Sequence, residues 1–268
     1  MAYKVLNNVS VKDVTSSDLL SLKTDLLVIV INKNTKDKVV NQLAKDVSSH
    51  LKESGSSVLV PNAKSFNAKN VLLVKGFQDS DQIHKLISMY QSIAQKGNQL
   101  KAKDISIMPG TVYPKGKCEM WLIEMVAKTI ESNVYIFSET CNKTAKKPSV
   151  KKLNILVSSL TKSDLIKAKN AAKKGYAIGE GVNSAKYLGD LPANHCTPRI
   201  IEKKVKAMTK DFPKLKVKSF NENQMKKMGM GSFLSVSRGS EEPARMMVIE
   251  YKGGKSSEKP VALVGKGV

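Results

Sequence analysis

The first 160 residues alternate short apolar runs with longer amphipathic segments, and no other feature of the sequence constrains the fold as strongly. Such alternation is typical of an α/β sheet whose strands are joined by crossover helices. The longer segments carry apolar residues at three- and four-residue steps, which indicates helices that pack on the sheet. The pattern predicts strands at 25–31, 57–60, 70–74, 104–108, 134–137 and 153–157 and helices at 38–52, 79–96 and 117–132.

A single long helix is predicted over residues 162–190, which are rich in alanine and lysine. Gly175, Gly179 and Gly181 lie inside it, although glycine costs a helix interior about 1 kcal/mol relative to alanine. We therefore expect these glycines to allow close packing against a neighbour, and we place a domain boundary at this helix.

The residues after this helix begin with a turn in which Thr197 is expected to cap a helix that has Pro198 at its first position. The pattern then predicts a helix over 199–209, a strand over 215–220, a short helix over 222–228 and strands over 245–251 and 260–264. Residues 261–264 are apolar throughout, as expected for a strand that is covered on both faces.

The composition places the chain among ordinary globular proteins. Its 268 residues are 41% hydrophobic and 25% charged, which argues against a disordered or fibrous chain. The longest apolar run covers only residues 26–31, far below the roughly 20 residues of a membrane-spanning helix. No secretory signal is recognisable at the amino terminus, so we expect a cytoplasmic protein that does not enter a membrane.

The formal net charge of +22 raises the question of nucleic acid binding, because basic surfaces release counterions from phosphates. Only Arg199, Arg238 and Arg245 are arginines, whereas specific recognition of bases and phosphates favours arginine. The remaining charge lies on scattered lysines, with pairs at 146–147, 151–152, 173–174 and 203–204. Solvation of the surface is the simpler interpretation, and non-specific contact with DNA or another polyanion stays open as the alternative.

Spacing alone yields no catalytic constellation. The three histidines show no metal-binding spacing, the three cysteines form no CxxC pair, and glycines that follow strands lack a phosphate-binding motif. No carboxylate has a defined acid or base partner. The candidate metal-binding, nucleophilic, phosphate-binding and acid–base residues are His50, His84, His195, Cys118, Cys141, Cys196, Gly76, Gly110, Glu119, Glu124, Glu241, Glu242 and Glu250.

Three sequence blocks, taken in their order along the chain, resemble those of a known family, which the spacing of single residues does not reveal. They are residues 183–194 (NSAKYLGDLPAN) with Thr197-Pro198, residues 228–240 (MGMGSFLSVSRGS) with Pro243, and residues 248–253 (VIEYKG) leading to 261–268 (VALVGKGV). Together they resemble the leucyl aminopeptidase (cytosol aminopeptidase) family of two-metal exopeptidases. Asp190 departs from the asparagine that is usual in the family at that position, and we expect little effect on the chemistry.

The resemblance implies a fold and a site. It implies a macro-domain-like amino-terminal α/β domain at 1–160, a bridging helix at 161–190 and the start of an α/β aminopeptidase catalytic domain at 191–268. Lys266 matches the lysine whose amine binds the second, more exchangeable metal. The family's other metal ligands and its catalytic residues belong to a segment that follows the Gly-Lys-Gly strand, so we expect them beyond residue 268 and treat the catalytic domain as truncated.

The same resemblance implies two divalent metal ions (manganese or zinc), peptide substrates and a homo-hexamer for the complete form. A single lysine is not enough to hold two metals, so we expect this chain to be inactive by itself. We also expect it to be poorly soluble or loosely associated when made alone, because its last strand would be exposed. Two alternatives stay open: a non-catalytic binding module for DNA or another polyanion, which salt-dependent binding would reveal, and the remnant of an interrupted gene.

Overall fold

The computed structural model describes residues 4–32, 38–77, 83–110, 113–141, 147–158, 160–255 and 257–267. It divides into two compact units, residues 2–190 and residues 191–268, and the long helix belongs to the first. Each unit is described by itself below.

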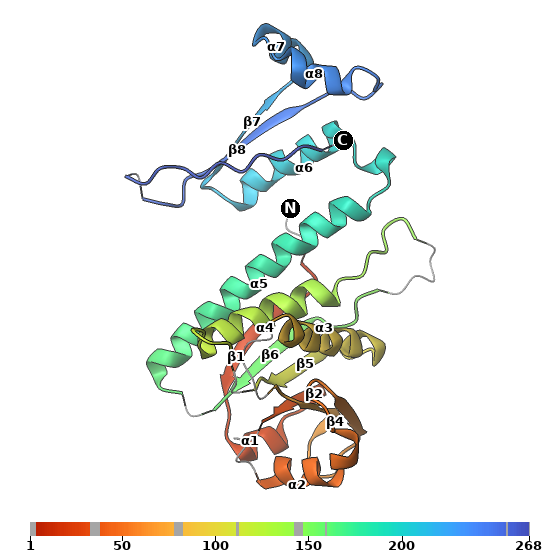
Figure 1. Ribbon diagram of the computed structural model, residues 1–268, viewed down its shortest axis with the longest axis vertical. Coiled ribbons are helices and arrows are strands. Elements are labelled where there is room, and N and C mark those ends of the chain that lie inside the picture. The colour runs from red at the N-terminus through yellow and green to blue at the C-terminus, as the bar shows by residue number, and fades with distance from the viewer. Residues whose placement is uncertain are drawn as a thin grey trace. The chain divides into compact units, whose positions relative to one another are not determined.

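A six-stranded sheet is the centre of residues 2–190, with the strand order β1-β6-β5-β2-β4-β3 (Figure 1). Every pairing is parallel except that of the edge strand β3, which runs antiparallel to β4. The strands are β1 (Asn8–Asp13), β2 (Thr24–Ile31), β3 (Ser57–Pro61), β4 (Ala68–Lys75), β5 (Asp104–Met108) and β6 (Lys152–Val157). The predicted α/β class is confirmed, and the sheet is mostly parallel.

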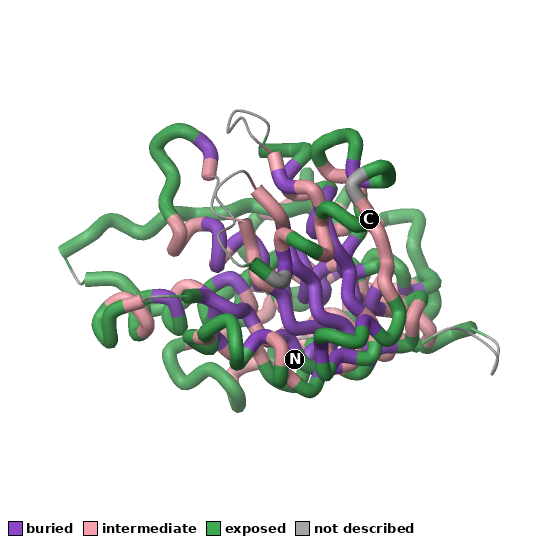
Figure 2. The backbone as a smooth tube through the Cα atoms, turned by 90° about the horizontal axis from the view of Figure 1, so that it is seen from below, coloured by how far each residue is buried: buried purple, intermediate pink, exposed green. Residues whose placement is uncertain are grey.

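Helices cover both faces of this sheet, and β2 shows why. Its side chains alternate between two buried clusters: Leu26 and Val28 pack with α3, α4 and α5, whereas Leu27 and Ile29 pack with α1 and α2. The most deeply buried backbone lies in these central strands (Figure 2). The helices are α1 (Ser16–Ser21), α2 (Lys38–Asp46), α3 (Ile83–Gln99), α4 (Glu119–Val134) and α5 (Lys162–Asp190), with a 3-10 turn at Ser48–His50.

Most predicted elements are present, with bounds shifted by a few residues. The helix expected over 38–52 stops at Asp46, and the one expected over 79–96 covers Ile83–Gln99, with its first predicted residues outside the described part of the chain. The helix predicted over 162–190 is confirmed. The sequence reasoning missed β1 and α1; β1 is held by parallel pairing with β6, more than 140 residues away.

The strand predicted over 134–137 is wrong. Val134 is the last residue of α4, and the residues that follow it form no strand. Their aromatic side chains contact α5 instead: the Tyr135 hydroxyl donates to Asp190 at 2.8 Å, and the Phe137 ring lies 6.3 Å from that of Tyr187. Packing against a helix therefore explains an apolar run that reads as a strand.

Two glycines allow α5 to lie directly on α4. A Cβ at Gly175 would come within 2.0 Å of the Glu124 carbonyl oxygen, and one at Gly179 within 2.7 Å of the Glu131 Cβ. Close packing is thus confirmed for both. Gly181 differs, because a Cβ there would meet nothing within 4 Å.

Glu131 is a buried carboxylate at the same helix contact. Its two oxygens accept hydrogen bonds from the backbone N–H groups of Val5 and Leu6, at 2.8 and 2.9 Å, and from the Asn183 amide of α5 at 2.9 Å. The Tyr176 hydroxyl donates to the Leu6 carbonyl at 2.7 Å. The carboxylate therefore ties α4, α5 and the start of the chain together. Burial raises its pKa to about 7, although these donors act in the opposite direction.

Residues 191–268 form a smaller arrangement around the antiparallel pair β7 (Leu215–Phe220) and β8 (Met246–Tyr251). The predicted cap is confirmed: the Thr197 side chain accepts from the Ile200 amide, and Pro198 opens α6 (Pro198–Asp211). Gly229, with φ of +71°, follows the C-cap residue Met228 of α7. The other elements are a 3-10 turn (Ala193–His195), α7 (Glu222–Lys227) and α8 (Gly231–Ser237), of which α8 was not predicted.

The strand predicted over 260–264 is wrong as well. Residues 260–267 take no helical or strand conformation, and Val261, Leu263 and Val264 are exposed rather than covered. A strand needs a neighbour for its backbone hydrogen bonds, and no described strand pairs with these residues. None of the described residues therefore covers this apolar segment.

The two helix glycines of α5 provide a matched test of this packing. Gly175→Ala places a methyl group against the backbone of α4 and is expected to destabilise residues 2–190 by about 1–3 kcal/mol. Gly181→Ala meets no neighbour and should stabilise them by up to about 1 kcal/mol through helix propensity. Urea unfolding followed by fluorescence of Trp121, the one tryptophan, measures both. Equal effects of the two substitutions would contradict the packing.

The buried Glu131 predicts a dependence of stability on pH. Its pKa is raised in the folded chain from 4.5 to about 7, so the folded state binds more protons than the unfolded state between these values. The free energy of unfolding should therefore fall as pH rises from about 4.5 to about 7. Glu131→Gln removes the titration, so the native chain should lose stability relative to this variant over that range, as measured by urea unfolding. Parallel pH curves would show that Glu131 does not titrate there.

Candidate functional site

Lys266 is the one residue that the sequence assigns to a metal, and it lies in the extended segment that follows β8. The residue is exposed, and the segment around it takes no regular structure. Among the residues that the structure describes, no three histidine, cysteine, aspartate or glutamate side chains gather in a way that could hold a metal ion. Among the described residues, Lys266 therefore contributes an amine to the candidate site, and no cluster of carboxylates accompanies it.

Ion pairs connect the elements that precede this segment. Arg199 of α6 reaches the Glu242 carboxylate with two N–H groups, at 3.0 and 3.1 Å. Glu202, one turn further along α6, accepts from Arg245 at 2.7 Å and also from Lys206. Both pairs attach α6 to the residues just before β8.

Glu202 is the centre of this network. Its hydrogen bonds to basic side chains lower its pKa to about 2, because they favour the charged form of the carboxylate. A second carboxylate acts beside it, since Glu222 at the start of α7 accepts from the Ala244 amide at 2.9 Å. The short connection into β8 is thus held from α6 and from α7.

The other candidates do not form a catalytic group. His50, His84 and His195 are exposed and lie in three different elements. Cys118 and Cys141 are exposed, and Cys196 is half-buried. Among the carboxylates, Glu124 pairs with Lys174 at 3.1 Å, and burial raises the pKa of Glu119. Glu131, which the sequence reasoning did not consider, is the most deeply buried carboxylate described, and its contacts are structural.

Gly76, which directly follows β4, and Gly110, which follows β5 after Pro109, flank one side chain. A Cβ at Gly76 would lie 1.9 Å from the Asn32 Oδ1 atom, and one at Gly110 would lie 2.5 Å from its Nδ2 atom. Asn32 follows β2, the strand between β4 and β5, so the three residues meet at the carboxyl edge of the sheet. The two glycines make room for the asparagine side chain.

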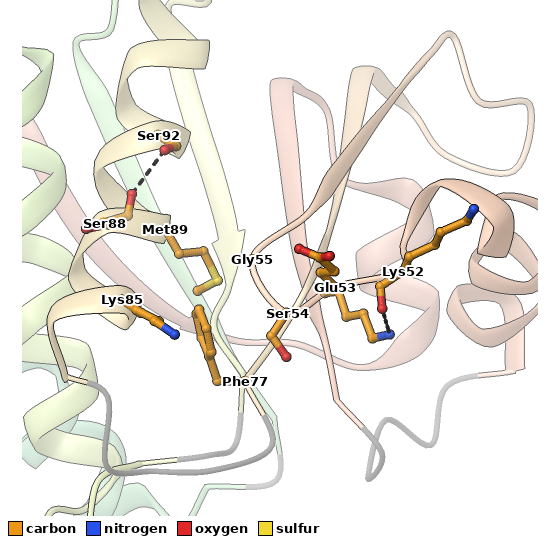
Figure 3. A pocket seen from close by; sticks show the side chains of 10 residues that line it. Lys52, Glu53, Ser54, Gly55, Phe77, Lys85, Ser88, Met89 and Ser92 are labelled. Carbon is orange, nitrogen blue, oxygen red and sulfur yellow. Dashed lines mark hydrogen bonds between the residues drawn. The ribbon is translucent and has the colours of Figure 1, made fainter.

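An open groove of about 790 Å³ lies near the same edge, between the β3–β4 pair and α3 (Figure 3). Three lysines line it, yet they do not converge: the Lys75 amine donates to the Lys52 carbonyl at 2.6 Å, and the Lys52 amine points away from Phe77 and Lys85 in Figure 3. Phe77 and Met89 form an apolar patch between them. The groove therefore lacks the converging donors of an anion site.

The sequence and the fold of this chain are similar to those of known proteins. Residues 183–268 match the family model for the catalytic domain of the cytosol aminopeptidase family. A probable cytosol aminopeptidase of Pseudomonas fluorescens (strain SBW25) is 32% identical over 263 residues, which are 92% of this chain and 52% of that protein. The cytosol aminopeptidase of Pseudomonas aeruginosa PAO1 is 30% identical over the same shares of each chain.

The chain is related to the cytosol aminopeptidases. Solved structures show the shared fold. A tomato leucine aminopeptidase mutant matches with a TM-score of 0.71 at 19% identity, and the match covers 94% of this chain and 52% of the tomato chain. The bottromycin maturation enzyme BotP in complex with Mn has a TM-score of 0.65 at 16% identity, over 84% of this chain and 45% of that one. The resemblance inferred from the three sequence blocks is confirmed.

The chain spans about half the length of the curated cytosol aminopeptidases that it matches. Where helices are described, none has the length and apolar character that crossing a bilayer requires. The family match begins within α5 and includes the ion-paired network and Lys266.

The Glu202 network predicts a measurable effect on the connection into β8. Glu202→Gln removes the charge that Arg245 contacts, so we expect the backbone amide of Ala244, which donates to Glu222, to exchange hydrogen about tenfold faster at pH 7. Because the pKa of Glu202 is about 2 in the folded chain and 4.5 otherwise, this difference should fade as pH drops through that range. Glu241→Gln, at an exposed neighbouring carboxylate, is the control. Equal exchange in both variants would show that the network does not hold the connection.

Proposed function

We propose that this chain forms part of a metal-dependent aminopeptidase of the leucyl aminopeptidase type, which removes amino-terminal residues from peptides. The observation that carries the proposal is the match of residues 183–268 to the catalytic domain of the cytosol aminopeptidase family. Identity of 32% over 92% of the chain supports it, because that similarity extends through both units. By the same relationship we place the protein in the cytoplasm and expect a homo-hexamer.

We assign Lys266 the role of a metal ligand. A deprotonated lysine amine can donate to a divalent cation, and a cation favours that neutral form. Two divalent ions, manganese or zinc, would polarise the peptide carbonyl and activate water in such an enzyme. The described residues do not fit a two-metal site by themselves, because Lys266 stands without a carboxylate cluster. We therefore propose that this chain alone does not hydrolyse peptides, and we derive no catalytic step from it.

Binding of a polyanion is the second candidate function, and the net charge of +22 is the observation that favours it. The structure gives it limited support, since two of the three arginines are engaged by Glu242 and Glu202 and the lysines around the groove do not converge. The family match makes the aminopeptidase the stronger proposal.

Activity assays test the proposed function. We expect the purified chain to release no nitroaniline from leucine p-nitroanilide in the presence of Mn²⁺. A fusion in which residue 268 is followed by the unmatched half of the Pseudomonas fluorescens relative should hydrolyse this substrate. In that fusion, Lys266→Met should lower kcat/KM by about 100-fold or more, the order of loss expected when a group that acts on the metal is removed.

Lys259→Met is the matched control, because Lys259 is an exposed lysine of the same segment that has no assigned role. It should leave kcat/KM unchanged. Turnover by the unfused chain would contradict its proposed inactivity. Equal kcat/KM values for the two lysine variants would contradict the metal role of Lys266.

A further inference from the structure

The groove between the β3–β4 pair and α3 has one wall that hydrogen bonds hold in place (Figure 3). The backbone of residues 53–56 forms a turn, in which the Ser56 amide and hydroxyl donate to the Glu53 carbonyl at 3.1 and 2.6 Å. The turn is tied to the end of β4, because the Gly55 amide donates to the Lys75 carbonyl at 2.7 Å and the Lys75 amide donates to Ser56 at 2.9 Å. Sites for small molecules are usually pre-formed in this way.

An aromatic ring lies against this wall. Gly55 has a φ of +87°, and a Cβ built on it would lie 3.4 Å from the Phe77 Cζ atom, so the ring is close to a backbone that carries no side chain. The Met89 side chain of α3, which is 5% exposed, points toward Phe77 in Figure 3. Aromatic rings and thioethers both pack well against a flat apolar group. The centre of the groove is therefore suited to a planar ring.

A single ammonium group stands beside this ring. The Lys75 amine is engaged by the Lys52 carbonyl, and the Lys52 amine points away. Lys85 differs from both, because it extends from α3 toward Phe77 (Figure 3). None of the ion pairs that the structure describes includes Lys85. A ligand in the groove thus meets an apolar surface and one positive charge.

This combination excludes other kinds of occupant. An inorganic anion needs several converging donors, which the diverging lysines do not provide. A neutral apolar molecule would take the Lys85 amine out of water without giving it a partner, which is unfavourable. The volume of about 790 Å³ lies within the range of small-molecule sites, roughly 300–1,000 Å³. A small ligand with a ring and one negative charge satisfies all three constraints.

We propose that this groove binds a small aromatic monocarboxylate, with its ring against Phe77 and Met89 and its carboxylate at Lys85. The lining residues lie between positions 52 and 92, outside residues 183–268, which match the aminopeptidase catalytic domain. The proposal therefore goes beyond the proposed function and does not depend on it. It gives residues 2–190 a ligand-binding role of their own.

Binding of phenylacetate to the full chain tests the site by NMR. With methionine labelled at its methyl carbon, we expect the Met89 signal to shift saturably, with a Kd of about 1 mM or lower, and to show contacts with the phenyl protons. Phenylacetamide carries the same ring without the charge and should bind about tenfold more weakly. Inorganic phosphate should leave the Met89 signal unchanged.

Three variants assign the contacts. Lys85→Met removes the cation and should raise the Kd for phenylacetate about tenfold while leaving the Kd for phenylacetamide unchanged. Phe77→Ala should weaken both ligands about tenfold, because both place their ring there. Lys52→Met is the matched control, since Lys52 lines the same groove with its amine pointing away, and it should change neither Kd. Unchanged amide signals outside the groove verify that each variant is folded.

Several outcomes would overturn the proposal. A Met89 signal that phenylacetate does not shift would show that the groove takes no ligand of this class. Equal Kd values for phenylacetate and phenylacetamide, or equal losses in Lys85→Met and Lys52→Met, would show that Lys85 does not select a carboxylate. A response to phosphate as strong as the response to phenylacetate would reassign the groove to inorganic anions.

Discussion

The contact between α4 and α5 is the constraint on which the rest of residues 2–190 depends. Gly179 and Glu131 make it together, because a Cβ at Gly179 would come within 2.7 Å of the Glu131 Cβ. The close approach brings Asn183 of α5 within hydrogen-bond distance of the buried carboxylate, whose remaining capacity holds the backbone of Val5 and Leu6. One helix contact therefore fixes the long helix and the start of the chain, which leads into β1, the edge strand opposite β3.

The two units are stabilised in different ways. In residues 2–190, strands such as β2 are buried on both faces between helices, so the hydrophobic effect supplies most of the stability. Residues 191–268 rely on caps and ion pairs, among them Arg199 with Glu242 and Arg245 with Glu202. Such partly exposed pairs fix geometry but add little free energy, so this unit has a defined local shape without a core of its own.

Local signals in the sequence predicted much of this fold. The long helix 162–190, the Thr197-Pro198 cap and the apolar strands of the sheet follow from periodicity and capping chemistry, which act over a few residues. The failures arise where distant residues decide the structure. Strand β1 depends on β6, and residues 134–137 pack on α5 instead of pairing as a strand. The burial of Glu131 was not predicted, because the sequence around a single glutamate in a helix does not indicate whether its side chain is buried.

The candidate site shows the same limit in another form. The metal role of Lys266 is proposed from sequence blocks that resemble a family, since the composition and spacing around a lysine in a Gly-Lys-Gly turn do not indicate a metal ligand. The structure does not place other candidate ligands around Lys266. The network of α6, α7 and β8 precedes it in the chain, and residues 261–267 lack a pairing partner among the described strands. A metal ligand must be held within a fraction of an ångström of its productive position. The chain thus supplies the proposed donor, Lys266, while none of the described strands pairs with residues 260–267 to fix its position.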